Sequence, residues 1–265
     1  MLTEDDPLLL RHDDPRGVVT VTLNRPQAFN ALSDGMLAAL QAELDALMND
    51  GSARVLVLAA SGKAFCAGHD LREMRAQPSL DYYRGLFARC AKVMLAIQRL
   101  PIPVIAKVQG VATAAGCQLV ATCDLAVAVR SARFAVSGVN LGLFCSTPAV
   151  ALSRNVGRKE AFEMLVTGEF ISAEEAQRRG LVNRLVDDAA ALDAEVEKLA
   201  ASIVSKPRIA VALGKELFYR QLEAGVEAAY IDAGQTMACN MMDEAALEGV
   251  QAFNEKRPPA WGTRR

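Results

Sequence analysis

The sequence has few of the side chains that build metal sites and no excess of charge of one sign. Only two of its 265 residues are histidines, His12 and His69, and its six cysteines form no Cys-x-x-Cys pair. We therefore expect no metal site. With 29 basic and 31 acidic residues the net charge is −2. A chain so nearly neutral is not expected to bind nucleic acid or an anionic membrane.

Two further absences concern the location of the protein. No apolar run is long enough for a membrane span. Residues 1–17 are acidic and interrupted by Pro7 and Pro15, whereas a secretory signal starts basic and a mitochondrial leader avoids acidic residues. The sequence therefore predicts a cytoplasmic protein whose cysteines are reduced thiols, mostly buried as small apolar side chains.

Strand-like and helix-like runs alternate between residues 18 and 129. Apolar and β-branched residues predict strands at 18–23, 54–59, 104–108 and 125–129, and three- and four-residue apolar spacing predicts helices at 34–48, 80–100 and 113–122. Ser33 is the expected N-cap of the first helix. This order is typical of an α/β fold built from repeated units.

The pattern becomes mainly helical from about Ser146. Helices are predicted at 148–155, 158–166, 173–179, 188–204, 209–221 and 226–256, the last with a break near Asp243, and one short strand at 182–186. We divide the chain into a core, residues 1–200, and a helical portion, residues 201–265. The helical portion is expected to pack onto a neighbouring subunit.

Two turns rich in small residues lie between strand-like and helix-like runs. Residues 62–72 read GKAFCAGHDLR and residues 109–124 read QGVATAAGCQLVATCD. Small side chains let the backbone approach a ligand closely and leave N–H groups free to point at it. If the fold brings the two turns together, they supply a pair of donors for a developing oxyanion.

Six segments in order resemble the crotonase family, the enoyl-CoA hydratase/isomerase superfamily. They are LNRPQAFNAL (23–32), KAFCAGHDL (63–71), PVIAKVQGVATAAGCQLVATCDLAVA (103–128), ARFAVSGVNLGL (132–143), ISAEEAQRRGLVNRLV (171–186) and EGVQAFNEKRPP (248–259). The combination of GHDL, ATAAGCQL and VNLGLFCSTP most resembles one subgroup of this family. The resemblance implies a spiral of β-β-α units with a C-terminal helical portion.

The resemblance also implies how the protein is used. Family members bind an acyl-CoA thioester and stabilise its enolate, with no covalently bound cofactor, and they assemble as homotrimers or as hexamers made of two trimers. An enzyme of the lyase class, resembling enoyl-CoA hydratase, acting in fatty acid metabolism is therefore expected.

Carried over residue by residue, the resemblance implies that the backbone N–H groups of His69 and Ala115 bind the thioester oxygen. Other expected contacts to coenzyme A are Asp70, Leu71 and Arg72 along the pantetheine, Arg25 and Ala28 near the nucleotide, and Phe253 and Lys256 near the adenine and phosphates, the last two from an adjacent subunit. For the Asp70 side chain itself we predict a structural role, as the cap of the following helix.

The sequence departs from the family at the residues that activate water. Hydratases resembling this chain carry two glutamates there, whereas this chain has Gln118 and Gly138. An amide can hydrogen-bond but cannot exchange a proton near neutral pH, and glycine offers no side chain. General acid–base catalysis supplies about a hundredfold to ten-thousandfold in rate. The usual two-carboxylate hydration is therefore not expected.

Three hypotheses remain open. The first is a slow hydratase-like lyase in which Gln118 and other neutral groups hold the water. The second is a decarboxylase of a malonyl-CoA-type substrate that uses His69, because loss of CO2 gives the enolate without a strong base. The third is an acyl-CoA binder with little or no catalysis.

Overall fold

The computed structural model describes residues 6–261 and is built around two sheets. Residues 1–5, part of the acidic start, lie outside the described residues. The larger sheet has the strand order β1-β2-β3-β5-β7-β10. Its strands are β1 (Leu9–Asp13), β2 (Val18–Leu23), β3 (Val55–Ala60), β5 (Val104–Val108), β7 (Leu125–Val129) and β10 (Arg184–Val186). Only the β1–β2 pair is antiparallel.

The smaller sheet carries the two small-residue turns. Its order is β4-β6-β8-β9, and only β8 and β9 pair antiparallel. The strands are short: β4 (Ala64–Cys66), β6 (Val111–Thr113), β8 (Arg133–Ala135) and β9 (Ile171–Ser172). Because β4 and β6 are parallel neighbours, the turns that follow them leave the same edge of the sheet.

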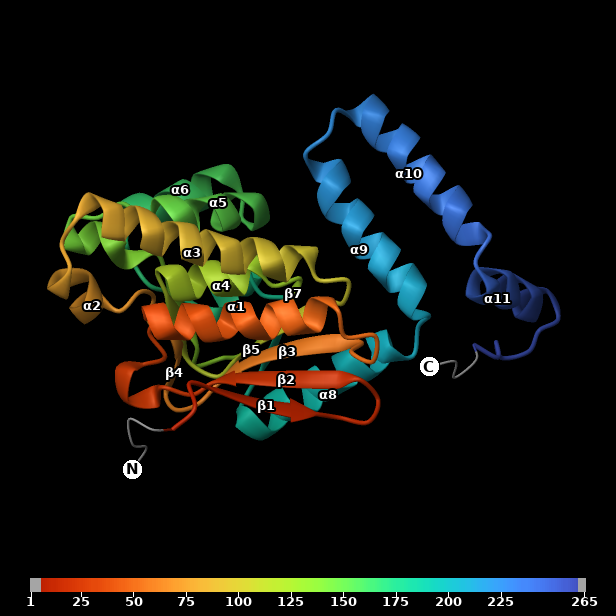
Figure 1. The fold of residues 1–265 in the computed structure, drawn as a ribbon, viewed down its shortest axis with the longest axis horizontal. Helices are drawn as coiled ribbons and strands as arrows, with labels where there is room; N and C mark the ends of the chain where they lie inside the picture. Colours follow the sequence, from red (N-terminus) through yellow and green to blue (C-terminus); the bar gives the residue numbers. More distant parts are fainter. Residues whose placement is uncertain (1–5, 262–265) are drawn as a thin grey trace.

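Helices cover the sheets and continue beyond them (Figure 1). They are α1 (Asp34–Met48), α2 (Leu71–Ala76), α3 (Leu80–Arg99), α4 (Ala115–Thr122), α5 (Ser146–Asn155), α6 (Arg158–Thr167), α7 (Ala173–Arg178), α8 (Ala189–Val204), α9 (Arg208–Leu222), α10 (Val226–Met241) and α11 (Glu244–Asn254), with 3-10 helices η1 (Pro26–Ala28) and η2 (Ser137–Leu141). None of the helices within residues 6–261 is both long and apolar enough to span a membrane.

The core forms where the predicted periodicities place it. Ser33 caps α1 by accepting a hydrogen bond from the Met36 N–H at 3.1 Å, as expected. The apolar stripe of α1 is buried, and so are the first five residues of β3. A strand buried on both faces is typical of a parallel sheet between helical layers. The predicted α/β class is confirmed.

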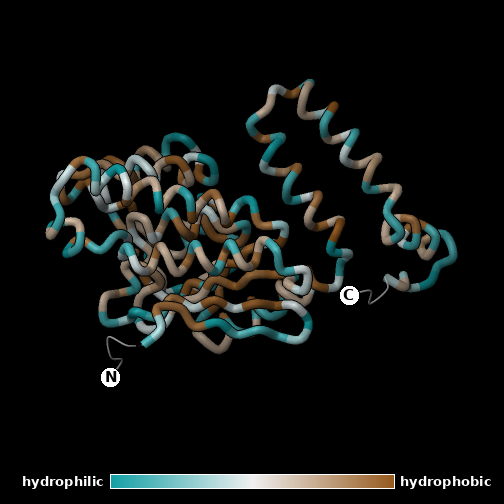
Figure 2. The backbone as a smooth tube through the Cα atoms, viewed as in Figure 1, coloured by the Kyte–Doolittle hydropathy of each residue, from teal (hydrophilic) through white to brown (hydrophobic). Residues whose placement is uncertain are grey.

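An arm made of α9, α10 and α11 extends away from the rest of the molecule (Figure 1). No residue of α10 is buried, and Val226, Tyr230 and Met237 are each more than two-thirds exposed. Figure 2 shows hydrophobic residues along this arm as well as in the sheets. The arm therefore presents apolar side chains that this single chain does not cover.

A buried ion pair fastens the arm to the core. Lys215 of α9 donates to the Asp124 carboxylate at 2.7 Å and to the carbonyls of Ile97 and Ile102, both at 2.9 Å. Tyr219 donates to the other Asp124 oxygen at 2.7 Å. Burial lowers the pKa of Lys215, although the Asp124 charge acts in the opposite direction. Helix α9 is thus fixed to the core by polar contacts of Lys215 and Tyr219.

The long helices lie within two residues of their predicted bounds, but several short elements differ. The helix predicted at 113–122 begins at Ala115, because residues 111–113 pair as β6 with β4 and β8. The break expected near Asp243 is confirmed, since Asp243 caps α11 through the Ala245 N–H. Strand β1 was not expected. His12 lies on it and is exposed.

Candidate active site

The two small-residue turns touch each other at Gly68. Its φ angle is +92°, a backbone conformation that favours glycine. A β-carbon at this position would lie 2.9 Å from the Ala114 Cβ and 3.2 Å from the Ala115 nitrogen. Only a residue without a side chain lets the turn after β4 pack this closely against the start of α4. The fold therefore brings the two turns together, which is the condition for a shared pair of donors.

The direction of the His69 N–H is set by its neighbours. Leu32 donates its N–H to the Gly68 carbonyl at 2.7 Å and accepts from the Asp70 N–H at 3.3 Å. Both bonds belong to the residues flanking His69, so the His69 N–H points away from Leu32. No acceptor for it is found among the backbone groups of residues 6–261. This amide is available to a ligand.

The Ala115 N–H is the first amide of α4. First-turn amides have no partner within their own helix, and none is found for this one in the described part of the chain. The preceding Ala114 has a φ of +49°, an unusual value for a residue with a side chain. All eight residues of α4 are buried. The helix dipole therefore adds positive potential to a site shielded from water.

The His69 imidazole lies against Phe87 of α3, with ring centres 5.5 Å apart. Neither ring nitrogen has a hydrogen-bond partner among residues 6–261. Burial lowers the pKa of His69, while the Leu32 carbonyl and the Asp34 charge act in the opposite direction. The ring is therefore neutral at neutral pH, and each nitrogen can accept or donate one hydrogen bond.

The two positions for which the resemblance implied water-activating glutamates, 118 and 138, hold no carboxylate. Gln118 is 4% exposed, and its Oε1 has no partner among the described residues. A β-carbon on Gly138 would lie 2.4 Å from the Leu143 carbonyl oxygen and 2.7 Å from the Cys145 Sγ. The space next to Gly138 is thus already filled by residues 143–145. The Asp34 carboxylate, whose charge acts on His69, is paired with Arg89 at 2.6 Å.

The cysteines near these positions do not offer a thiolate. Burial raises the pKa of Cys117 to about 12. Burial also raises the pKa of Cys145, although the Gly138 N–H, 3.3 Å from its sulfur, opposes the shift. Both thiols are therefore protonated at neutral pH and act as small packing groups.

Comparison with known proteins places this architecture in one family. A model described as enoyl-CoA hydratase/isomerase matches residues 13–264. This chain belongs to the enoyl-CoA hydratase/isomerase family. The predicted crotonase fold is confirmed by solved structures. An enoyl-CoA hydratase of Mycobacterium smegmatis has a TM-score of 0.95 and 71% identity, covering 97% of this chain and 99% of that one.

The subgroup that GHDL, ATAAGCQL and VNLGLFCSTP resemble is the enoyl-CoA hydratase domain-containing protein 3 type, and this prediction is also confirmed. The human enoyl-CoA hydratase domain-containing protein 3 structure has a TM-score of 0.92 and 43% identity, covering 96% of this chain and 100% of that one. The mouse protein of the same name, described as mitochondrial, is 44% identical over 259 residues, which are 98% of this chain and 86% of that protein.

The predicted cytoplasmic location is wrong by the same comparison. The mouse, rat, frog and human relatives of this subgroup are all named as mitochondrial proteins. The prediction rested on the absence of a leader pattern in residues 1–17. The absence of such a pattern does not identify a compartment.

Other residues expected to contact coenzyme A lie in or near the turn at residues 62–72. Asp70 caps α2 by accepting from the Arg72 and Glu73 N–H groups, as predicted, and also from Arg25 at 2.7 Å. Leu71 is 53% exposed, Arg72 is exposed and Ala28 is half-buried. The structure thus brings Arg25 and residues 69–72 together, and their contact with coenzyme A stays a prediction.

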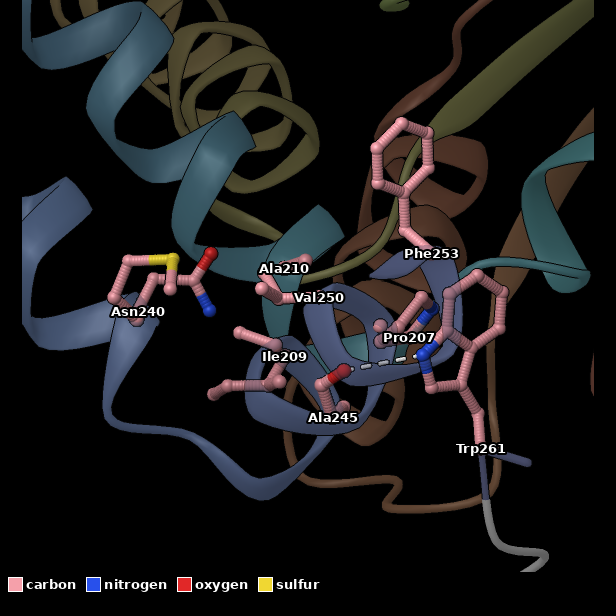
Figure 3. Close-up of a pocket in the computed structure, with 11 residues that line it drawn as sticks. Pro207, Ile209, Ala210, Asn240, Ala245, Val250, Phe253 and Trp261 are labelled. Atoms are coloured by element: carbon pink, nitrogen blue, oxygen red, sulfur yellow. Dashed lines mark hydrogen bonds between the residues drawn. The ribbon is translucent and has the colours of Figure 1, made fainter. Parts of the chain in front are cut away.

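Phe253 and Lys256 are not brought to this site within one chain. Both lie at the end of α11, whereas β4 and α2 lie at the opposite end of the molecule (Figure 1). Phe253 is 83% exposed. It borders a groove of about 400 Å³ between α9, α10 and α11, where Trp261 donates to the Ala245 carbonyl at 3.1 Å (Figure 3). Any role for these two residues in binding requires a neighbouring subunit.

Sequence reasoning missed Asn30, which shapes the loop beside the site. Its φ angle is +53° and it is fully buried. Its side chain donates to the Ser61 and Ala64 carbonyls at 2.8 and 2.9 Å and accepts from the Arg25 N–H at 2.9 Å. An asparagine between apolar residues after Arg-Pro was the available signal, since asparagine tolerates this conformation.

No group of three or more metal-ligating side chains is found in residues 6–261.

Proposed function

We propose that this protein binds an acyl-CoA thioester and stabilises the enolate of its acyl group with the N–H groups of His69 and Ala115. The contact of Gly68 with Ala114 and Ala115 carries the proposal, because it joins two turns that each leave one amide without a backbone partner among residues 6–261. Two donors aimed at a developing oxyanion stabilise it most in a site shielded from water. Removing one such donor costs about 3 kcal/mol of barrier.

Within this proposal the enzyme is a lyase resembling enoyl-CoA hydratase, with Gln118 holding the water. The Gln118 amide cannot remove a proton, so hydration relies on orientation and on the oxyanion donors alone. We therefore expect hydration about a hundredfold or more slower than with a carboxylate at this position.

Decarboxylation of a malonyl-CoA-type substrate is a second candidate, favoured by the neutral surroundings of the amide pair. Loss of CO2 places the electron pair directly in the enolate, so no base is required. A carboxylate about 4 Å from the substrate carboxylate would oppose binding by roughly 4 kcal/mol at an effective dielectric of about 20. The neutral residues at positions 118 and 138 remove that repulsion. A neutral His69 could donate one hydrogen bond to the departing carboxylate.

We further propose that the protein assembles as a homotrimer, or a hexamer of two trimers, through the arm. The exposed apolar side chains of α10 support an interface between subunits. In such an assembly Phe253 and Lys256 would reach the coenzyme A of an adjacent subunit. This explains why they lie far from the site of their own chain.

One experiment separates the candidates. The purified protein is incubated with crotonyl-CoA and with methylmalonyl-CoA while loss of enoyl absorbance, release of CO2 and thioester binding are measured. Hydration lost in Gln118→Leu supports the first candidate. CO2 release that is lost in His69→Ala and slowed in Gln118→Glu, but not in Gln118→Leu, supports the second. Binding without turnover of either thioester would leave only an acyl-CoA binder, and no binding would overturn the proposal.

A further inference from the structure

An ion pair lies next to the His69 amide. The Arg25 Nη1 is 2.7 Å from the Asp70 Oδ2, and the Asp70 side chain is only 8% exposed. Asp70 directly follows His69 in the chain. We propose that Arg25 and Asp70 are a positioning pair that fixes the direction of the His69 N–H. This inference rests on the proposed function, in which that N–H binds the thioester oxygen.

The direction of the His69 N–H depends on one peptide plane. The N–H belongs to the same trans peptide as the Gly68 carbonyl, so the two point in opposite directions. That carbonyl accepts from the Leu32 N–H at 2.7 Å, and the next peptide is held by the bond from the Asp70 N–H to the Leu32 carbonyl at 3.3 Å. The amide therefore keeps its direction only while Leu32 and residues 68–70 stay in register.

The ion pair also holds Leu32 in register with residues 68–70. Arg25 lies at the start of the segment that carries Leu32, and its N–H and carbonyl are both tied to Asn30. Asn30 in turn is bound to the Ser61 and Ala64 carbonyls. The guanidinium thus projects from a fixed loop onto Asp70. The ion pair thus adds a side-chain link between segment 25–32 and the turn at 62–72. The other links are the two Leu32 hydrogen bonds, the bond from Asn30 to the Ala64 carbonyl, and the bond from the Ala67 N–H to the Phe29 carbonyl at 3.0 Å.

The Asp70 carboxylate is bound on both oxygens. One oxygen accepts from the Arg72 and Glu73 N–H groups at 3.0 and 3.4 Å, and the other accepts from Arg25. Burial alone would raise the pKa of Asp70, but Arg25 and these amides outweigh it and hold the pKa below its usual value. The carboxylate is therefore charged at neutral pH and links α2, the first turn and Arg25 together.

The positioning role and a role of Arg25 as a ligand of coenzyme A phosphate predict different measurements. A phosphate ligand contributes to affinity and leaves the thioester carbonyl unchanged. A positioning pair changes the polarisation of that carbonyl, because the N–H donor loses alignment. The carbonyl stretching band of bound crotonyl-CoA labelled with carbon-13 at the thioester carbonyl, measured by infrared spectroscopy, reports this polarisation directly.

The test compares Asp70→Asn, Arg25→Gln and the double variant with the intact protein. Asparagine can still accept from the Arg72 and Glu73 N–H groups, so α2 keeps its N-cap. We expect each single variant to lose most of the carbonyl band shift and roughly tenfold to a hundredfold in turnover of the substrate identified above, with the Kd for crotonyl-CoA changed less than about threefold. The double variant should be no worse than either single one, because both remove the same contact.

Two controls make the outcome decisive. Arg130→Gln removes a solvent-exposed pair with Asp187 and should change neither the carbonyl band shift nor turnover. Arg25→Lys keeps the charge and should restore part of the band shift if Arg25→Gln proves unstable. A full band shift in Asp70→Asn, with only the Kd raised in Arg25→Gln, would overturn the positioning role. A bound thioester without any band shift in the intact protein would instead overturn the proposed function.

Discussion

Gly68 is the residue on which the geometry of the two turns depends. In Gly68→Ala the new β-carbon would lie 2.9 Å from the Ala114 Cβ, and the φ of +92° would be strained. We expect the turns to separate and turnover to fall about a hundredfold, as for loss of one oxyanion donor. Steady-state kinetics and the carbonyl band shift of bound crotonyl-CoA measure the effect.

Gly142 provides the matched control for this substitution. Its φ of +78° imposes a similar backbone penalty, but apart from its two chain neighbours no described residue has an atom within 4 Å of its β-carbon position. Gly142→Ala should lower stability slightly and leave turnover within about threefold, since only backbone strain is added. Equal losses of turnover in the two variants would show that strain, and not the contact between the turns, is responsible.

His69 should make the stability of the protein depend on pH. Its pKa is lowered by burial in the folded chain, whereas the unfolded chain has the ordinary value of about 6.5. Below pH 6.5 the unfolded chain binds a proton that the folded chain does not, so stability falls as the pH falls. Urea unfolding at pH 7.5 and 5.5 should show a loss of at most about 1.4 kcal/mol from this group.

The variant His69→Gln tests this assignment, because its side chain does not titrate. The loss of stability between pH 7.5 and 5.5 should be smaller in this variant than in the intact protein. An unchanged pH dependence would assign the effect to groups other than His69.

At the scale of elements, the Lys215–Asp124 pair fastens α9 to the core. Lys215→Met should cost about 3–5 kcal/mol, because Asp124 would stay buried without its cation. The free energy of unfolding from urea titration measures this cost. Arg220→Met serves as the control, because it removes the exposed pair between Arg220 of the same helix and Asp232 of α10, and it should have little effect. Similar losses in the two variants would argue against a special role for the buried pair.

Long elements were predicted from the sequence and short ones were not, for physical reasons. Helices such as α1 and α3 have several turns of apolar periodicity, so their stripes are visible in the sequence. Strands β4, β6, β8 and β9 have two or three residues, which is too short for an alternating pattern. They exist because they pair with one another. Strand β1 was missed because four of its five residues are exposed.

The candidate site was predictable where backbone groups form it. Gly68, His69 and Ala115 lie in turns whose small residues mark them. No local sequence pattern indicates contacts between distant segments. The contacts of Asn30 and the Arg25–Asp70 pair depend on how residues 25–32 fold over residues 64–70. The filled space at Gly138 depends likewise on residues 143–145 and could be found only in three dimensions.

At the scale of the whole molecule, the proposed assembly depends on the arm. Val226, Tyr230, Met237 and Met241 follow one stripe of α10, and all four are exposed. Charges on this stripe, as in Tyr230→Glu with Met237→Lys, should convert the proposed trimer into monomers. Sedimentation velocity measures the change, and binding of crotonyl-CoA should weaken if Phe253 and Lys256 act on a neighbouring subunit.

The control for this variant lies on the opposite side of the same helix. Ala228 is exposed but about half a turn away from the stripe. Ala228→Lys should leave the sedimentation coefficient unchanged. A monomeric intact protein at micromolar concentration would contradict the proposed assembly.

The packing around Gly138 has an evolutionary consequence. In this chain a glutamate at position 138 would collide with the Leu143 carbonyl and the Cys145 sulfur. A carboxylate therefore cannot be installed here by exchanging a single codon, since the main chain at 143–145 would have to be rerouted first. Any evolutionary route to an acid at that place has to begin with residues 143–145.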